Sequence, residues 1–234
     1  MKTRSAISSV ADDEQAWNSQ QLASVVPAPR FRVWTYSAPA IVLGCSQRWL
    51  SEAAQQRLEG RAGLLVRESG GGAVLTGPCL VGVSVVLPNG HPWLGEGLLE
   101  SYRHLGQLHA VALAELGMAA LSLPPPAVAD ANERLGRRVD WACFGSLSPW
   151  ELIDAQGRKL VGLAQRRQKT GVLLVAGTLM ATPDWQLLCD AMGQAQDAPV
   201  LRQRTVSCAE LARQPISPAQ FAQVLTQALA HSLT

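Results

Sequence analysis

At 234 residues, the chain is long enough for one large domain or two small ones, and a hydrophobic content of 47% is sufficient for a sizeable core. A net charge of +2 is too small to indicate nucleic-acid binding, and no apolar run is long enough to cross a bilayer. Five cysteines without regular spacing argue against a disulfide framework and a zinc site, and the beginning of the chain lacks a secretory signal, so the sequence predicts a cytoplasmic protein.

The first 60 residues predict two short helices and two strands. In chain order these are a weakly patterned helix within 12–26, strands over 31–37 and 40–46, and a helix over 51–58. Residues 1–25 are expected to be loosely ordered. The two strands are joined by Ala38 and Pro39, and Ser51 caps the second helix.

Three consecutive glycines, Gly70 to Gly72, lie between two strand-like apolar runs, 64–66 and 80–87. Glycine accepts positive φ and lets backbone N–H groups approach a ligand closely. Arg67 adds a charge that suits a phosphate or a carboxylate. The stretch therefore predicts either an anion-binding loop or the turn of a hairpin, with equal weight. No Gly-Lys-Ser/Thr follows, and a strand follows where a dinucleotide fingerprint needs a helix.

The middle of the chain predicts a long helix, a polar loop and a three-stranded meander. Residues 97–118 repeat apolar side chains close to the helical period, whereas residues 124–138 are polar and loop-like. The meander has Gly157 and Gly171 at its turns, and its strands are 150–155, 159–167 and 172–180.

The C-terminal part predicts three helices. Thr182 and Pro183 begin the first of them, with the proline at the first helical position. Capping boxes begin the other two: Ser207 with Glu210, and Ser217 with Gln220. No repeat, low-complexity tract or boundary interrupts the sequence, so residues 1–234 are expected to form a single domain.

Two motifs stand out when the chain is read as a whole: RxSGGGAV at 67–74 and GRKLVGxAQRRxK at 157–169. Together they resemble the lipoate-protein ligase and octanoyltransferase family, whose wider group includes the biotin-protein ligases. Residues 33–47 resemble the family's early hairpin, and the matches keep the family's order over roughly 31–212. The resemblance implies an α+β fold (mixed α/β), with mostly antiparallel sheets flanked by helices. The family's ligases often carry an extra C-terminal accessory domain, but a full one is not expected in 234 residues.

The resemblance also implies the residues of the site. In one class of octanoyltransferases a nucleophilic cysteine and a Phe precede a strand of the S-W-Y-E-L type, and Cys143-Phe144 before SPWEL matches that pattern. Lys159 stands at the family's GxK lysine, which contacts the acyl carbonyl and the adenylate phosphate. A cation beside a thiol stabilises the nucleophilic thiolate. The implied substrate-binding residues are Arg67, Ser69, Gly70, Gly71, Gly72, Ala73, Gly162, Ala164, Gly177 and Thr178, and no metal ligand is implied.

Alternatives to these assignments stay open. Cys143 also fits a small buried hydrophobe, and Lys159 fits a solvated turn lysine. Cys79 is the rival nucleophile because it follows the glycine run closely. Of Arg166 and Arg167, only one can face the site, because neighbouring side chains on a strand point to opposite faces.

The chain departs from the family pattern at three places. Thr76-Gly77 stands where the family commonly has His-Asp, and Ala176-Gly177-Thr178 replaces a His-Gly-Ser/Thr strand. Leu80 stands where the ATP-using ligases have Asn and the cysteine-dependent transferases commonly have leucine. The missing Asn argues against adenylation, and the missing histidines weaken the case for every family activity.

Three functions therefore remain. The first is an acyltransferase that attaches octanoyl or lipoyl groups to lysines of lipoyl carrier domains through a Cys143 thioester, without a cofactor and with acyl carrier protein as a possible donor. The second is a lipoate-protein ligase that uses ATP and Mg²⁺ and passes through a lipoyl-adenylate. The third is a non-catalytic acyl-binding homologue. The implied carriers are the E2 subunit of 2-oxoacid dehydrogenases and the H protein of glycine cleavage; nucleic-acid and membrane partners are not expected.

Overall fold

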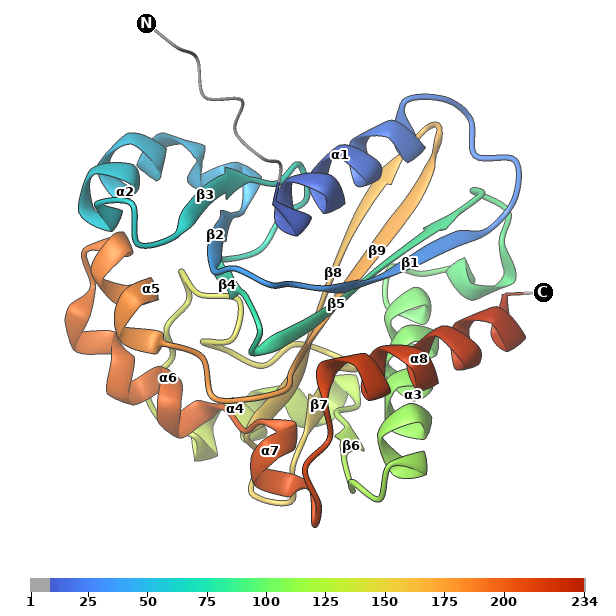
Figure 1. The fold of residues 1–234 in the computed structure, drawn as a ribbon. Helices are drawn as coiled ribbons and strands as arrows, with labels where there is room; N and C mark the ends of the chain where they lie inside the picture. Colours follow the sequence, from blue (N-terminus) through green and yellow to red (C-terminus); the bar gives the residue numbers. More distant parts are fainter. Residues whose placement is uncertain (1–8, 234) are drawn as a thin grey trace, which may run out of the picture.

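The computed structural model describes residues 9–233, which form two sheets with helices packed around them (Figure 1). The larger sheet has six strands, and every pair of neighbours is antiparallel. In spatial order the strands are β1 (Arg30–Thr35), β5 (Leu80–Leu87), β9 (Gly171–Leu179), β8 (Lys159–Gln168), β7 (Leu152–Ile153) and β6 (Leu121–Ser122). All eight residues of β5 are buried, as expected for a continuous apolar run in a central strand.

The smaller sheet has three strands and corrects two predictions. Its central strand β2 (Ala40–Leu43) pairs parallel with β3 (Gly63–Val66) and antiparallel with β4 (Val74–Thr76). The predicted early hairpin is wrong, because β1 and β2 belong to different sheets. The predicted glycine hairpin is also wrong: residues 67–73, here called the glycine loop, connect β3 to β4, and β5 lies in the other sheet.

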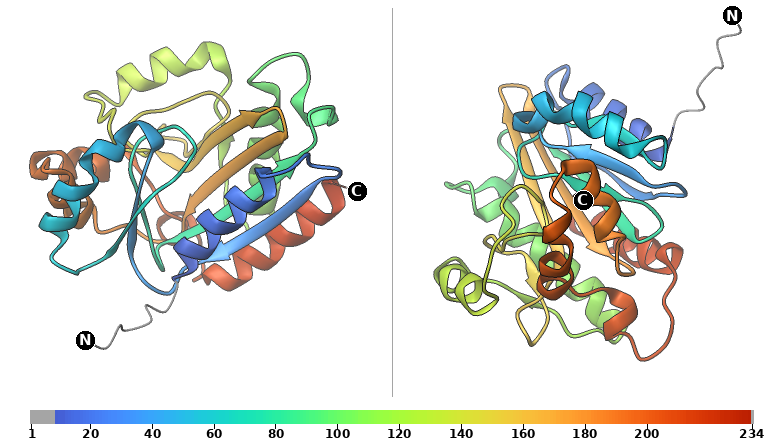
Figure 2. Two further views of the ribbon diagram at one scale, coloured as in Figure 1. Left: turned by 90° about the horizontal axis from the view of Figure 1, so that it is seen from above. Right: turned by 90° about the vertical axis from the view of Figure 1, so that its left-hand side faces the viewer.

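Helices cover both faces of the larger sheet (Figure 2). α1 (Val10–Leu22) packs on one face, where Leu22 contacts Val86 and Leu173. α3 (Glu100–Glu115) and α8 (Pro218–Ser232) pack on the opposite face and enclose the largest apolar cluster. A second apolar cluster joins the smaller sheet to α2 (Ser51–Leu58), α5 (Trp185–Met192) and α6 (Ala198–Arg204).

Most predicted helices and strands are observed, but the short strands β4 and β6 were not predicted, and four other segments differ. The expected loop at 124–138 contains the helix α4 (Val128–Arg134), and α6 was not predicted. The helix expected to begin at Pro183 begins at Trp185, because the Asp184 carboxylate caps it by accepting from the Leu187 N–H. The described part of 1–25 is the packed helix α1 rather than a loosely ordered segment; residues 1–8 lie outside the described residues. The predicted capping boxes begin α7 (Cys208–Leu211) and α8.

Candidate active site

Three glycines on neighbouring strands form a floor that crosses the larger sheet. Gly162 of β8 is opposite Gly177 of β9, which is opposite Gly82 of β5. Strands lie about 4.8 Å apart, so this glycine floor spans about 10 Å. A different side chain lies over each glycine: a Cβ there would be 3.5 Å from Cys143 Sγ at Gly162, 3.3 Å from Leu80 Cδ1 at Gly177 and 2.1 Å from Tyr36 Oη at Gly82.

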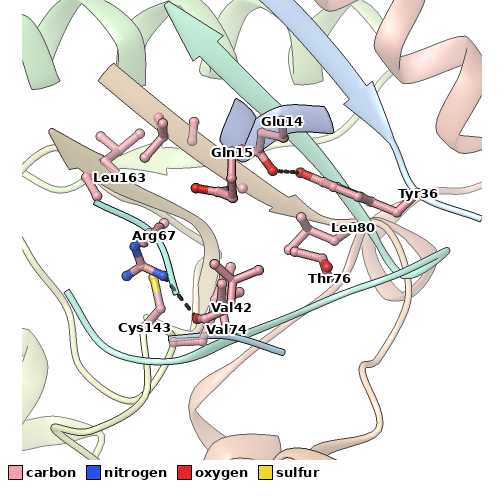
Figure 3. Close-up of a pocket in the computed structure, with 16 residues that line it drawn as sticks. Glu14, Gln15, Tyr36, Val42, Arg67, Val74, Thr76, Leu80, Cys143 and Leu163 are labelled. Atoms are coloured by element: carbon pink, nitrogen blue, oxygen red, sulfur yellow. Dashed lines mark hydrogen bonds between the residues drawn. The ribbon is translucent and has the colours of Figure 1, made fainter. Parts of the chain in front are cut away.

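An apolar cavity with a volume of about 70 Å³, partly open to solvent, lies over Gly162 and Gly177 of this floor. Cys143 and Arg67 lie at one side of the cavity, and the pair of Glu14 and Tyr36 lies across it (Figure 3). The walls between these ends are largely aliphatic, with Val42, Val74, Leu80, Leu163, Ala164 and Val175 among them.

The structure brings Cys143 and Lys159 together, as the resemblance implied. A methyl group on Gly162 would lie 3.5 Å from Cys143 Sγ and 3.6 Å from Lys159 Nζ, so the sulfur and the nitrogen flank the same small space. Lys159 is only 2% exposed, which excludes a solvated turn lysine. Its ammonium donates to the carbonyls of Cys143 (2.7 Å) and Ser146 (3.0 Å), and so holds residues 143–148, here called the cysteine loop.

Glu151 completes the surroundings of Lys159 and was not recognised from the sequence. Its Oε1 lies 2.7 Å from Lys159 Nζ, and both side chains are 2% exposed. The carboxylate also accepts from the backbone N–H of Ser148 (2.8 Å) and of Leu163 (3.2 Å). Burial raises the pKa of Glu151, and the Lys159 ammonium opposes that rise. The available signal was an acid within the otherwise apolar run 149–153, shortly before the lysine motif.

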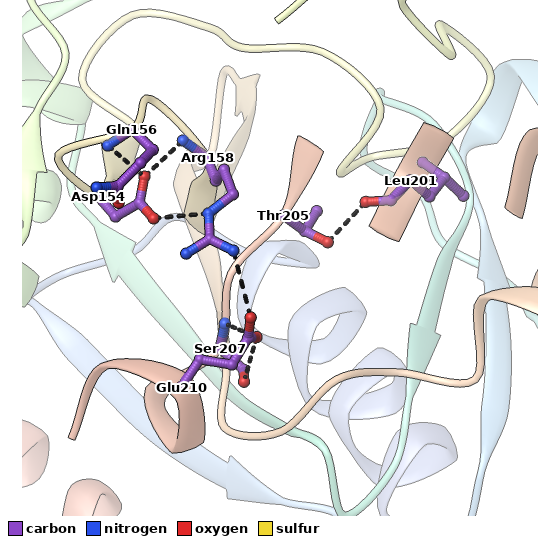
Figure 4. Close-up of polar contacts among 7 residues, drawn as sticks. All are labelled: Asp154, Gln156, Arg158, Leu201, Thr205, Ser207 and Glu210. Carbon is purple, nitrogen blue, oxygen red and sulfur yellow. Dashed lines mark hydrogen bonds and ion pairs between the residues drawn. The ribbon is translucent and has the colours of Figure 1, made fainter. Parts of the chain in front are cut away.

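A polar network behind the site fixes the turn that precedes Lys159 (Figure 4). Asp154 accepts from the backbone N–H and the Nε of Arg158, both at 2.8 Å. Arg158 also pairs with Glu210 at 3.4 Å, and Glu210 caps α7 through Ser207. The carbonyl of Lys159 accepts from the Val206 N–H at 3.0 Å. The main chain of Lys159 is therefore held by the C-terminal segment as well as by β7, where Ile153 is its strand partner.

The glycine loop positions the cysteine loop. Ala73 forms two backbone hydrogen bonds at the start of that loop: its N–H donates to the carbonyl of Trp141, just before the loop, and its carbonyl accepts from the Cys143 N–H, each at 2.8 Å. Gly72 allows this approach, because a Cβ there would lie 2.5 Å from the Trp141 oxygen. Arg67 is 7% exposed and donates to the carbonyls of Gly70, Gly72 and Val42, so its guanidinium shapes the loop.

The other predicted site residues divide into two groups. Those that line the cavity are Arg67, Cys143, Gly162, Ala164 and Gly177. Those that do not are Ser69, Gly70, Gly71, Gly72, Ala73, Lys159 and Thr178, and the Thr178 hydroxyl is buried without a hydrogen-bond partner.

Three further residues settle the alternatives at the edge of the site. Arg166 pairs with Glu68 of the glycine loop, whereas Arg167 donates to the Gly97 carbonyl beside α3, so the two arginines point to opposite faces of β8, and neither lines the cavity. Cys79 does not line the cavity, and burial raises the pKa of its thiol. Among residues 9–233 no cluster of His, Cys, Asp and Glu could hold a metal ion, and no helix is long and apolar enough to cross a membrane.

Glu14 and Tyr36 were also missed by sequence reasoning. The Tyr36 hydroxyl donates to Glu14 Oε2 at 2.8 Å, and both side chains are buried. Burial raises the pKa of Glu14 to about 7, although the Tyr36 hydrogen bond and the Arg67 charge oppose the rise. No local sequence signal indicates this pair, because α1 and the segment after β1 meet only in the folded chain.

Comparison with known proteins identifies related sequences and folds. The family model described as the lipoyl protein ligase A/B catalytic domain matches residues 13–230. An octanoyltransferase LipM of Kyrpidia tusciae is 28% identical over 211 residues, which are 88% of this chain and 76% of that protein. An octanoyltransferase LipM of Moorella thermoacetica is 36% identical over 157 residues, which are 66% and 54% of the two chains.

Solved structures share the fold at low sequence identity. The bi-partite lipoate protein ligase of Thermoplasma acidophilum, solved with its E2 lipoyl domain, has a TM-score of 0.67 at 18% identity and covers 96% of this chain and 77% of that one. A lipoate-protein ligase A bound with ATP has a TM-score of 0.65 at 18% identity, with 96% and 79% covered. The expected α+β fold is thereby confirmed.

Proposed function

Since the chain belongs to the family of lipoyl protein ligase A/B catalytic domains, we propose that it transfers an octanoyl or lipoyl group to a lysine of a lipoyl carrier domain through a thioester on Cys143. The observation that carries the proposal is the position of Cys143. Its sulfur lies at the edge of an apolar cavity, over Gly162 and next to the buried Lys159. The relatives named as octanoyltransferases support the class of reaction.

The glycine floor supports an extended acyl chain as the substrate. The chain would lie across the strands, from the sulfur over Gly162 to the Tyr36 hydroxyl over Gly82. That span of about 10 Å is comparable with the length of an extended eight-carbon chain. Gly162 and Gly177 line the cavity and keep it free of side chains of their own, whereas Gly82 leaves room for the Tyr36 hydroxyl at the far end.

The reaction has two acyl-transfer steps. In the first, the Cys143 sulfur attacks the carbonyl of a donor thioester, the bond from the carbonyl to the donor sulfur breaks, and the donor leaves as a thiol with the proton that Cys143 gave up. In the second, the ε-amine of the carrier lysine attacks the Cys143 thioester, an amide forms, and Cys143 regains its thiol proton. Acyl carrier protein is the proposed donor, and neither step needs ATP.

Leu80 supports the transferase over the ATP-dependent ligase. Its side chain lies over Gly177, where it forms part of the apolar wall. The family's ligases carry a polar Asn at this position, and a leucine offers no hydrogen bond to a nucleotide. The ligase would need ATP and Mg²⁺ and would release pyrophosphate, so the two reactions differ in a measurable product.

The decisive experiment is an intact-mass spectrum after incubation with octanoyl-acyl carrier protein. We expect the protein to gain one octanoyl group, Cys143→Ala to gain none and to lose transfer to a lipoyl domain, and Cys79→Ala to behave as the unaltered protein. Full transfer by Cys143→Ala would eliminate the thioester. Pyrophosphate release that depends on ATP would identify a ligase, and acyl binding without any transfer would identify a binding protein.

A further inference from the structure

The ammonium of Lys159 has no free hydrogen in the structure. A protonated lysine carries three N–H donors. They meet three acceptors at hydrogen-bond distance: the carbonyls of Cys143 and Ser146, and the carboxylate of Glu151. Two of these acceptors belong to the cysteine loop and one is an anion. Lys159 is thus held by the loop and by Glu151, and its charge is balanced before any substrate is present.

Glu151 is placed to control which way that ammonium points. Its two carboxylate oxygens reach both sides of the site: Oε2 accepts from the N–H of Ser148 at the end of the cysteine loop, and Oε1 accepts from the N–H of Leu163 next to Gly162. The carboxylate is fixed by the backbone, so the lysine adapts to it. A thiolate on Cys143 would be a second anion beside the same ammonium.

We propose that Glu151 is a positioning residue of the transfer reaction, which holds the Lys159 ammonium against the cysteine loop in competition with the Cys143 sulfur. This role rests on the proposed thioester function and deepens it. Glu151 keeps the loop in place for acyl transfer, and it also restrains the thiol, because an ammonium that is paired with a carboxylate stabilises a thiolate less than a free one.

The other charged groups around the sulfur do not replace this pair. Arg67 lines the cavity, but its guanidinium is bound to the carbonyls of the glycine loop. Glu14 lines the cavity from α1 and accepts from Tyr36. Both remain unchanged when Glu151 is altered, so a change in the thiol's reactivity can be assigned to the pair of Lys159 and Glu151.

The test compares thiol reactivity with turnover in Glu151→Gln. Iodoacetamide alkylation of Cys143 is followed as a function of pH by peptide mass spectrometry, which separates it from the exposed Cys45. When the Glu151 carboxylate is removed, the Cys143 thiolate is the anion that remains beside the Lys159 ammonium. We expect the pH midpoint of alkylation to fall by about one unit, a shift typical of a nearby opposite charge, while octanoyl transfer slows at least tenfold. A side chain that only supports the fold would not raise reactivity and lower turnover together.

A double-mutant cycle shows whether Glu151 acts through Lys159. In the Lys159→Met background, Glu151→Gln should leave the alkylation midpoint unchanged. The double variant also leaves neither buried charge without its partner. It therefore remains informative if the single variant Glu151→Gln does not fold. Glu151→Asp keeps the charge and should keep the midpoint while transfer slows. Glu133→Gln, an exposed carboxylate on α4, is the control and should change neither quantity.

Three results would overturn the proposal. They are an unchanged or raised alkylation midpoint in Glu151→Gln, an equal shift in the Lys159→Met background, and normal octanoyl transfer in Glu151→Gln. The alkylation experiment does not use an acyl donor. Its outcome is therefore separate from the acyl-enzyme experiment: a protein that never forms the octanoyl thioester refutes the proposed function, and alkylation still tests the pairing.

Discussion

Glu14→Gln should make the stability of the protein less dependent on pH, because it removes a buried carboxyl group that titrates. Glu14 is 8% exposed, and burial raises its pKa from the ordinary value of 4.5 to about 7. The folded protein therefore binds this proton more tightly than the unfolded chain does. The stabilising contribution is fully present below pH 4.5 and is lost as the pH rises through about 7.

The size of the effect follows from the width of that window. Each unit of pKa difference corresponds to about 1.4 kcal/mol, so the free energy of unfolding should fall by up to about 3 kcal/mol between pH 5 and pH 8 through Glu14 alone. The glutamine does not titrate, and its carbonyl oxygen can still accept from the Tyr36 hydroxyl. The variant should therefore equal the unaltered protein near pH 5 and exceed its stability near pH 8.

Urea unfolding at both pH values measures this difference, with Glu52→Gln as a control at an exposed carboxyl on α2. Subtracting the control removes the contribution of ordinary surface carboxyls. If Glu14→Gln and the unaltered protein lose the same free energy of unfolding between pH 5 and pH 8, Glu14 does not hold a proton in the folded state. The end of the cavity formed by Glu14 and Tyr36 would then be better solvated than its burial indicates.

Three further substitutions test the geometry of the site. Gly162→Ala places a methyl 3.3 Å from Lys159 Cε and 3.5 Å from the cysteine sulfur, so octanoyl transfer should fall at least tenfold with little change in melting temperature; normal turnover would mean that this space is not used. Gly71→Val should destabilise the protein by about 2 kcal/mol in urea unfolding, because φ there is +94° and the Cβ would lie 2.9 Å from Arg67. Gly70→Ala is the control and should be tolerated, because nothing lies within 4 Å of a Cβ at Gly70. Glu210→Gln should cost less than about 1 kcal/mol of stability, because its pair with Arg158 is partly exposed. Arg158→Gln also leaves the buried Asp154 carboxylate without its guanidinium, so it should cost about 3 kcal/mol and slow transfer. Glu210→Gln should add little to Arg158→Gln in a double-mutant cycle; additive losses would contradict the linkage.

The elements predicted correctly are those with local signals. The meander of β7, β8 and β9 has alternating or apolar runs separated by Gly157 and Gly171, and both turns are observed. The capping boxes of α7 and α8 involve residues three positions apart. Such patterns depend on a few neighbouring side chains, so one sequence is enough to recognise them.

The pairing of the early strands could not be predicted in the same way. β2, β3 and β5 are apolar runs, and β1 alternates polar and apolar residues, but nothing in their composition decides which of the four strands become neighbours. A hairpin is the simplest expectation for consecutive strands. The observed arrangement instead divides them between two sheets, which gives each apolar face a separate layer of helices to pack against.

Two residues of the candidate site were predicted from the sequence, but the residues around them were not. The motif resemblance led to Cys143 and Lys159, which the structure places together. Glu151 and Glu14 were missed because a buried carboxylate looks like a surface acid until its neighbours are known. The glycine floor was missed for a similar reason: Gly82, far from the others in sequence, joins them only through strand register.

The bonds of the cysteine loop make the position of the sulfur depend on both sheets. Cys143 is held beside the smaller sheet through Ala73 and beside the larger sheet through Lys159. A substitution that shifts one sheet relative to the other should therefore move the sulfur away from Gly162 although Cys143 itself is unaltered. The reactivity of this thiol is thus a local measure of how the two sheets pack together.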